Sequence, residues 1–114
     1  MTTGATPKLS VVITNYNYAD YVGTAIDSVL SQDVAIELVV VDDCSADKSR
    51  DIITSYGDRI IPVLQEVNQG HGGGFNAGYA RTTGDLVMFL DADDFLLHKA
   101  DAEQDQDDHD PRTQ

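Results

Sequence analysis

Two aspartates near the end of this 114-residue chain have the spacing of a cation site. An apolar run, residues 86–90, leads directly into Asp91-Ala92-Asp93-Asp94. A strand advances about 3.3 Å per residue and alternates its faces, so a strand through this run directs Asp91 and Asp93 to the same side. Two carboxylates aimed at one point repel each other unless a proton or a hard cation such as Mg2+ or Mn2+ lies between them. The alternative is a pair of solvated aspartates at a strand end.

A second acidic pair, Asp42-Asp43, follows the apolar run 36–41. Aspartate is a good helix cap, which is one interpretation of the pair. The other is a binding role, because a carboxylate accepts the imide N–H of a base such as uracil. The ring of Tyr16, which follows the apolar run 9–14, could stack on the same base.

The segment 70–78 contains five glycines where a helix is expected to begin. Each glycine costs about 1 kcal/mol of helix stability relative to alanine. The glycines suit either close packing on a sheet or the approach of a diphosphate or sugar to backbone N–H groups at a helix N-terminus. No GxGxxG follows the first strand and no GxxxxGK(S/T) occurs, so neither dinucleotide nor P-loop binding is indicated.

Hydrophobic periodicity predicts strands that alternate with helices. Short links and nearly continuous apolar strands are typical of a parallel sheet that is covered on both faces. We therefore expect an α/β, Rossmann-like fold with about four parallel strands in the order 3-2-1-4, flanked by helices. The strands are expected at residues 9–14, 36–41, 59–65 and 85–90.

Three helices are expected between these strands. The first begins near Asp20, the second is capped by Ser45 or Asp47 and stops at Gly57, and the third covers residues 70–83. The third helix is expected to direct three side chains to the core, namely Phe75, Tyr79 and Ala80.

Every predicted strand ends in polar residues. In open parallel sheets, ligands bind beyond the carboxyl ends of the strands, near the point where the strand order reverses. The fold should therefore bring these polar residues to one rim. They are Asn15, Tyr16 and Asn17 after the first strand, Asp42 and Asp43 after the second, Glu66, Asn68 and Gly70 after the third, and Asp91 and Asp93 after the fourth.

The composition limits the class of partner. Twenty acidic and seven basic residues give a formal net charge of −13, which argues against nucleic acid or an anionic membrane surface. The single cysteine, Cys44, cannot form an internal disulfide, so a cytoplasmic setting is expected. No leader and no membrane segment are indicated. Residues 98–114 have no large apolar side chain and are expected to form a disordered acidic tail, with no chemistry for its histidines.

Five ordered segments resemble the family 2 inverting glycosyltransferases of GT-A fold. They are residues 11–17 (VVITNYN), 28–32 (SVLSQ), 37–45 (ELVVVDDCS), 68–70 with 76–78 (NQG and NAG), and 84–94, which ends in FLDADD. The resemblance spans residues 9–97. It implies that residues 1–97 form the half of a GT-A domain that binds a nucleotide-diphospho-sugar, with Mg2+ or Mn2+ as cofactor.

The resemblance also implies roles for individual residues. Thr14 and Tyr16 would line the base pocket, and Asp43, with Asp42, would contact uracil, which favours a UDP-sugar. Further donor contacts are expected from Asn15, Asn68, Gly70 and Asn76.

At the other end of the donor, Asp93 would bind the cation directly and Asp91 would face the ribose or a water molecule of the cation. The chain departs from the family at Gly74-Phe75-Asn76, where many members read Ala-Arg-Asn, so one expected cationic contact is absent.

The family's acceptor site and general base are expected in a later segment, so no catalytic residue is expected here. The predicted function is donor binding by a truncated glycosyltransferase that is weakly active or inactive alone. A non-catalytic nucleotide- or metal-binding module is the alternative. A phospho-acceptor receiver domain is disfavoured because the acidic pair follows the second strand. Without the later segment, the fourth strand should be open, and we expect a homodimer through that surface.

Overall fold

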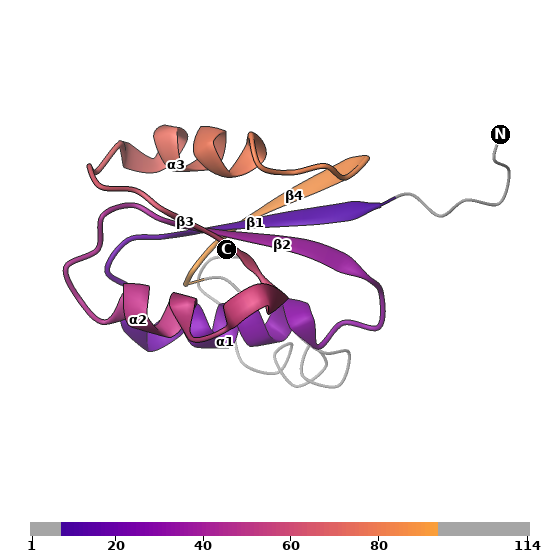
Figure 1. Ribbon diagram of the computed structural model, residues 1–114, viewed down its shortest axis with the longest axis horizontal. Helices are drawn as coiled ribbons and strands as arrows, with labels where there is room; N and C mark the ends of the chain where they lie inside the picture. Colours follow the sequence, from indigo (N-terminus) through magenta and orange to yellow (C-terminus); the bar gives the residue numbers. More distant parts are fainter. Residues whose placement is uncertain (1–7, 94–114) are drawn as a thin grey trace, which may run out of the picture.

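The computed structural model describes residues 8–93, so the predicted acidic tail, residues 98–114, lies outside the described residues. Four parallel strands form one sheet in the order β3-β2-β1-β4, which confirms the predicted topology. Helix α3 covers one face, and α1 and α2 cover the other (Figure 1). The elements in chain order are β1 (Leu9–Asn15), α1 (Ala19–Leu30), β2 (Ile36–Asp42), α2 (Ser49–Thr54), the 3-10 turn η1 (Gly57–Arg59), β3 (Ile61–Leu64), α3 (Gly70–Tyr79) and β4 (Leu86–Asp91).

The two faces of the sheet bury alternate residues of the central strands. Val11, Ile13, Leu38 and Val40 pack with the apolar residues of α1 and with Ile53 of α2. The intervening Val12, Val39 and Val41 form a smaller cluster on the face that α3 covers. Because both faces are covered, the central strands read as continuous apolar runs rather than as an alternation with polar residues.

Two local expectations are corrected by the structure. Helix α2 begins at Ser49, with Lys48 rather than Ser45 or Asp47 in the cap position. The Asp47 carboxylate instead accepts the N–H groups of Ser49 and Ala19, so it ties the start of α2 to the start of α1. The expected strand 59–65 is shorter: Arg59 belongs to η1, and β3 covers Ile61–Leu64.

Helix α3 differs most from the sequence prediction. It ends at Tyr79, and the side chain of Tyr79 is 59% exposed rather than buried in the core. Gly74 and Gly78 face the sheet instead, and a Cβ atom on Gly78 would overlap Val12 Cγ1 and lie 2.9 Å from Val41 Cγ2. The glycines therefore allow the helix backbone to lie directly on the valines of β1 and β2. The helix has no room for larger residues on this face, and its two aromatic rings, Phe75 and Tyr79, lie against Phe89 of the edge strand β4, with ring centroids 5.0 and 6.5 Å from that of Phe89.

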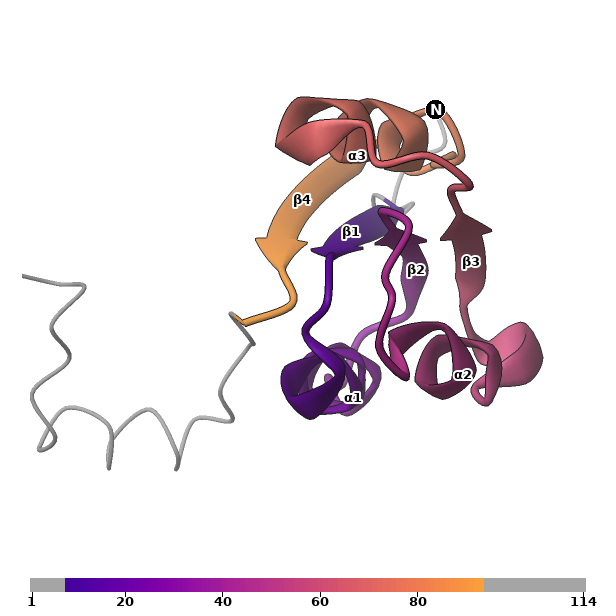
Figure 2. The same ribbon diagram turned by 90° about the vertical axis from the view of Figure 1, so that its left-hand side faces the viewer.

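The strands at the two edges of the sheet are unlike each other (Figure 2). Strand β3 has four residues and carries an exposed Pro62, which cannot donate a backbone hydrogen bond to another strand. Strand β4 has six residues and leaves Leu86, Met88 and Phe89 substantially exposed. In the described part of the chain, no helix is long and apolar enough to cross a membrane.

At the amino ends of the strands, opposite the polar rim, Glu37 joins three segments. One carboxylate oxygen accepts the Thr83 N–H at 2.8 Å and the Ser10 hydroxyl at 2.7 Å, and the other accepts the Thr83 hydroxyl at 2.9 Å. Lys8 Nζ lies 3.4 Å away. These hydrogen bonds, the Thr83 N–H foremost, lower the pKa of Glu37 from 4.5 to about 2.

We predict that Gly78→Ala lowers the free energy of unfolding by about 1–3 kcal/mol, because the new methyl group overpacks the valines beneath it. Chemical denaturation measures the change. Gly72→Ala is the matched control, since a Cβ atom there meets nothing within 4 Å. That variant should gain up to about 1 kcal/mol from helix propensity. Equal effects of the two substitutions would contradict the packing of α3 described above.

We predict that Glu37→Gln lowers the free energy of unfolding at pH 7 by about 1–2 kcal/mol, because the ionised carboxylate accepts these hydrogen bonds more strongly than an amide does. A folded-state pKa near 2 means that this stabilisation is complete above pH 4.5 and is lost as the pH falls toward 2. The difference between wild type and variant should shrink over that window in denaturation curves. Asp33→Asn, at an exposed loop position, should show no such pH-dependent difference.

Candidate functional site

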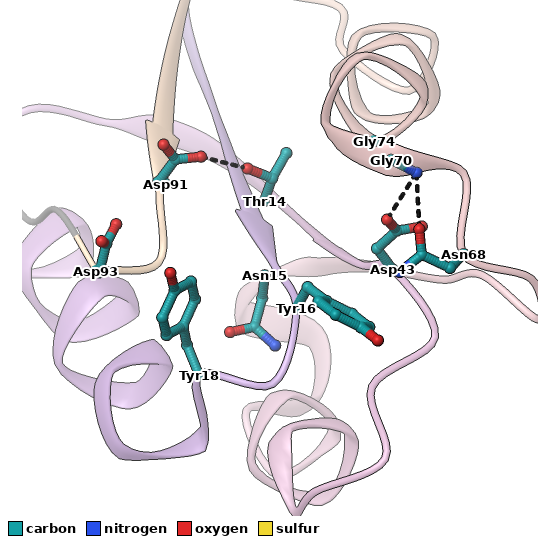
Figure 3. A pocket seen from close by; sticks show the side chains of 10 residues that line it. All are labelled: Thr14, Asn15, Tyr16, Tyr18, Asp43, Asn68, Gly70, Gly74, Asp91 and Asp93. Carbon is teal, nitrogen blue, oxygen red and sulfur yellow. Dashed lines mark hydrogen bonds between the residues drawn. The ribbon is translucent and has the colours of Figure 1, made fainter.

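A cavity of about 300 Å3 lies beyond the carboxyl ends of the strands, where the sequence predicts the polar rim (Figure 3). Several elements contribute to it, namely strands β1 and β4, the two loops that follow β2 and β3, and the first turns of α3. The lining residues are Thr14, Asn15, Tyr16, Tyr18, Asp43, Asn68, Gly70, Gly74, Asp91 and Asp93. The structure thus brings together most of the side chains that the sequence singled out.

One end of the cavity is formed by the two aspartates at the end of β4. Asp91 lies beside Thr14 in the β1–β4 register, and the Thr14 hydroxyl donates a 3.0 Å hydrogen bond to its carboxylate. The strand ends at Asp91, and the next turn is held by a hydrogen bond from the Ala92 N–H to the Thr14 carbonyl. Asp93 is therefore placed by this turn and by the burial of Ala92, and not by continued strand alternation. Both carboxylates still face the same cavity.

The other end of the cavity is formed by Asp43. Its two carboxylate oxygens accept the Gln69 N–H at 2.7 Å and the Gly70 N–H at 3.0 Å. The Asn68 side-chain oxygen accepts the same Gly70 N–H at 2.9 Å, and Gly70 has a φ of +76°, a conformation that favours glycine. Asp43 thus holds the start of α3 and faces the cavity at the same time. Asp43 can therefore both cap a helix and bind a ligand. The helix that it caps is α3, which is distant in sequence.

Asp42 does not reach the cavity, which corrects the expectation that it contacts a ligand. Its side chain is fully buried beneath the rim, where it accepts hydrogen bonds from Asn15 Nδ2 at 2.9 Å and from the Ser45 hydroxyl at 2.6 Å. Arg50 of α2 lies 3.7 Å from the same carboxylate. Neighbouring residues of a strand point to opposite sides, so only one member of the acidic pair can face the cavity.

Asn76 also lies outside the cavity lining, on an exposed position of α3. The face of the helix that meets the cavity carries Gly70 and Gly74 instead, because residues four apart share one side of a helix. Sequence reasoning missed Gly74 as a lining residue, and it also missed Tyr18. The signal for Tyr18 was its place in the loop after β1, two residues beyond Tyr16.

The chemistry of the two ends is different. Asp91 and Asp93 offer hard oxygen ligands of the type that Mg2+ and Mn2+ prefer. Among residues 8–93, no third histidine, cysteine or acidic side chain joins them as a possible metal ligand. Water and a bound anion can supply further ligands to a cation at this end, which is the usual way in which Mg2+ binds beside phosphate groups.

Comparison with known proteins identifies the family of this fold. Residues 10–104 match the model of the family described as glycosyl transferase family 2. The chain belongs to this family. Its similarity to curated glycosyltransferases is extensive: an uncharacterized glycosyltransferase of Nostoc is 56% identical over 92 residues, which cover 76% of this chain and 28% of that protein. The chain thus spans little more than a quarter of the length of this relative.

Solved structures of glycosyltransferases share this fold. Staphylococcus aureus TarS, residues 1–349, in complex with UDP-GlcNAc, matches 88% of this chain and 30% of the TarS chain, with 30% identity and a TM-score of 0.73. Glucosyl-3-phosphoglycerate synthase of Mycobacterium tuberculosis, in complex with Mn2+, UDP and glucosyl-3-phosphoglycerate, matches 75% of this chain and 33% of its own, with 28% identity and a TM-score of 0.65. The four-stranded sheet with its flanking helices therefore matches the GT-A fold of these glycosyltransferases.

Proposed function

We propose that this chain is the donor-binding half of a family 2 glycosyltransferase and that its rim cavity binds a nucleotide-diphospho-sugar with a divalent cation. The observation that carries the proposal is the pairing of Asp91 and Asp93 at one end of a single cavity with Asp43 at the other. A nucleotide-diphospho-sugar has a hydrogen-bonding base at one end and an anionic diphosphate that binds cations farther along. The end with Asp43 suits the base, and the end with Asp91 and Asp93 suits the diphosphate and its cation.

At the base end, Asp43 keeps lone pairs beyond the two that accept backbone N–H groups, so it can accept the imide N–H of uracil. The exposed ring of Tyr16 is available for stacking on the base, with Thr14, Asn15 and Asn68 close by in the lining. This chemistry favours a UDP-sugar. The UDP-GlcNAc and UDP complexes of the similar structures support the same choice.

At the other end, Asp93 would bind Mg2+ or Mn2+ directly. Asp91, which is held by Thr14, would face the ribose or a water molecule of the cation. When bound, the cation would stabilise negative charge on the departing diphosphate as a Lewis acid. The Mn2+ and UDP in the M. tuberculosis synthase complex support a divalent cation as cofactor.

This chain matches a quarter to a third of the length of its relatives. We propose further that glycosyl transfer needs residues outside the matched part. General-base catalysis contributes about 10²- to 10⁴-fold to rate, so donor binding alone would give a weak transferase. The other candidate is a non-catalytic nucleotide- or metal-binding module. Release of nucleoside diphosphate from UDP- and GDP-sugars in the presence of Mn2+ separates the two.

The cytoplasmic location inferred from the single cysteine stays a prediction.

We expect UDP to bind more tightly with Mn2+ than with a chelator, and we expect Asp93→Ala to abolish that difference, a loss of about tenfold or more, because the variant lacks the direct cation ligand. Isothermal titration calorimetry measures both affinities. Asp58→Ala removes an exposed carboxylate near the amino end of β3, far from the rim, and should retain the full Mn2+ effect. An unchanged Mn2+ effect in Asp93→Ala would refute the cation assignment.

We also propose that two copies of this chain associate through β4. The strand is an edge with three exposed apolar side chains and, unlike β3, no proline to block further pairing. Light scattering at tens of micromolar should report a dimer or a larger species. Leu86→Lys, at a position that is 58% exposed, should shift it toward monomer by placing a charge on the edge. A wild-type monomer at that concentration would be inconsistent with this interface.

A further inference from the structure

Tyr18 occupies a position between two cavities. It lines the rim cavity, and it also lines a second hollow of about 210 Å3 at the start of α1, together with Asn17, Ala19, Asp20, Tyr21 and Asp47. Its ring is 40% exposed, so the wall that it forms is open to a bound molecule. The resemblance to family 2 assigned no role to this residue.

The ring of Tyr18 is held in place before any ligand binds. It packs edge-to-face against Tyr21, with ring centroids 5.9 Å apart and an angle of 72° between the planes. The Tyr18 carbonyl accepts the N–H groups of Tyr21 and Val22, both at 2.9 Å. The start of the helix thus fixes the backbone of Tyr18, and Tyr21 limits the rotation of its ring. A side chain that is fixed in this way loses little conformational entropy when a ligand binds.

The loop that carries Tyr18 is also clamped from outside. The Asn17 N–H donates to the Ser45 hydroxyl at 2.8 Å, and the Asn17 side-chain oxygen accepts the Ala46 N–H at 2.7 Å. On the other side of Tyr18, the Ala19 N–H donates to Asp47 at 2.9 Å. The loop after β1 and the loop after β2 therefore hold each other on both sides of this tyrosine.

The hydroxyl group of Tyr18 points to the carboxylate end of the rim cavity. Figure 3 shows the ring directed toward Asp91 and Asp93, whereas Tyr16 lies toward Asp43. Within the part of the chain that the structure describes, the Tyr18 hydroxyl has no hydrogen-bond partner. It is a neutral donor at the place where the proposed function puts the cation and the diphosphate.

We infer that Tyr18 is a donor-contacting residue whose hydroxyl group donates a hydrogen bond to an oxygen of the β-phosphate, an inference that rests on the proposed function. Phosphate oxygens accept hydrogen bonds, and bonds to a charged acceptor are about twice as strong as bonds between neutral groups. The two tyrosines of the loop thereby take different parts of one ligand. Tyr16 contacts the base, and Tyr18 contacts the diphosphate.

The test compares Tyr18→Phe with wild type in calorimetric titrations of UMP and UDP, all with Mn2+. The phenylalanine ring keeps the packing against Tyr21 and removes only the hydroxyl group. UDP should bind about tenfold more weakly to the variant, and UMP, which lacks the second phosphate, should change by less than about twofold. Tyr21→Phe is the matched control because Tyr21 lines the second hollow and not the rim cavity. It should bind both nucleotides as wild type does.

Unchanged UDP affinity in Tyr18→Phe would overturn the inference. An equal loss for UMP and UDP would also overturn it, since the hydroxyl group would then act on the α-phosphate, on the nucleoside or on the loop. These outcomes are distinct from failure of the proposed function, in which wild type itself binds no UDP in the presence of Mn2+. In that case the inference about Tyr18 falls with it.

Discussion

The carboxylate of Asp42 is fully buried at the end of β2, where Asn15, Ser45 and Arg50 surround it. An ionised side chain in this position costs several kcal/mol unless partners compensate for the lost water, so the partners and the carboxylate depend on one another. Arg50 extends the network, because it donates to the Gln65 carbonyl and to Glu66 in the loop after β3. One buried charge thereby joins the ends of three strands, and the cavity above it takes its shape from this layer.

The contact between α3 and the sheet is the second constraint on the cavity. Gly78 allows the helix backbone to lie against Val12 and Val41, and Gly74 brings the preceding turn to the cavity wall. A Cβ atom on Gly74 would lie 3.5 Å from Thr14 Cγ2, so larger residues there would fill the space beside Thr14. The glycines lower the intrinsic stability of the helix, but they make close packing and an open cavity possible together.

Backbone conformations that are unusual for non-glycine residues occur in the two loops that clamp each other. Asn17 has a φ of +57° and Cys44 has a φ of +66°. Conformations of this kind cost of order 1–3 kcal/mol each and persist where the surrounding structure determines them. Here, the hydrogen bonds between the loops after β1 and β2 supply that constraint. They also fix the neighbouring Tyr16, Tyr18 and Asp43, three of the residues to which we assign contacts with the donor.

The sequence by itself determined the strand order and the rim. Apolar strands that alternate with helices through short links allow few sheet topologies, and polar residues follow each strand. It also singled out Asp43, Asp91 and Asp93, since their spacing after strands is a local property. Tertiary structure decided which member of the Asp42-Asp43 pair is buried, because that depends on where Asn15 and Arg50 lie in space. It likewise decided that Gly74 and Gly78 lie over the central strands while Phe75 and Tyr79 pack on Phe89 of the edge strand β4, since helix periodicity gives a face but not the distance at which that face packs.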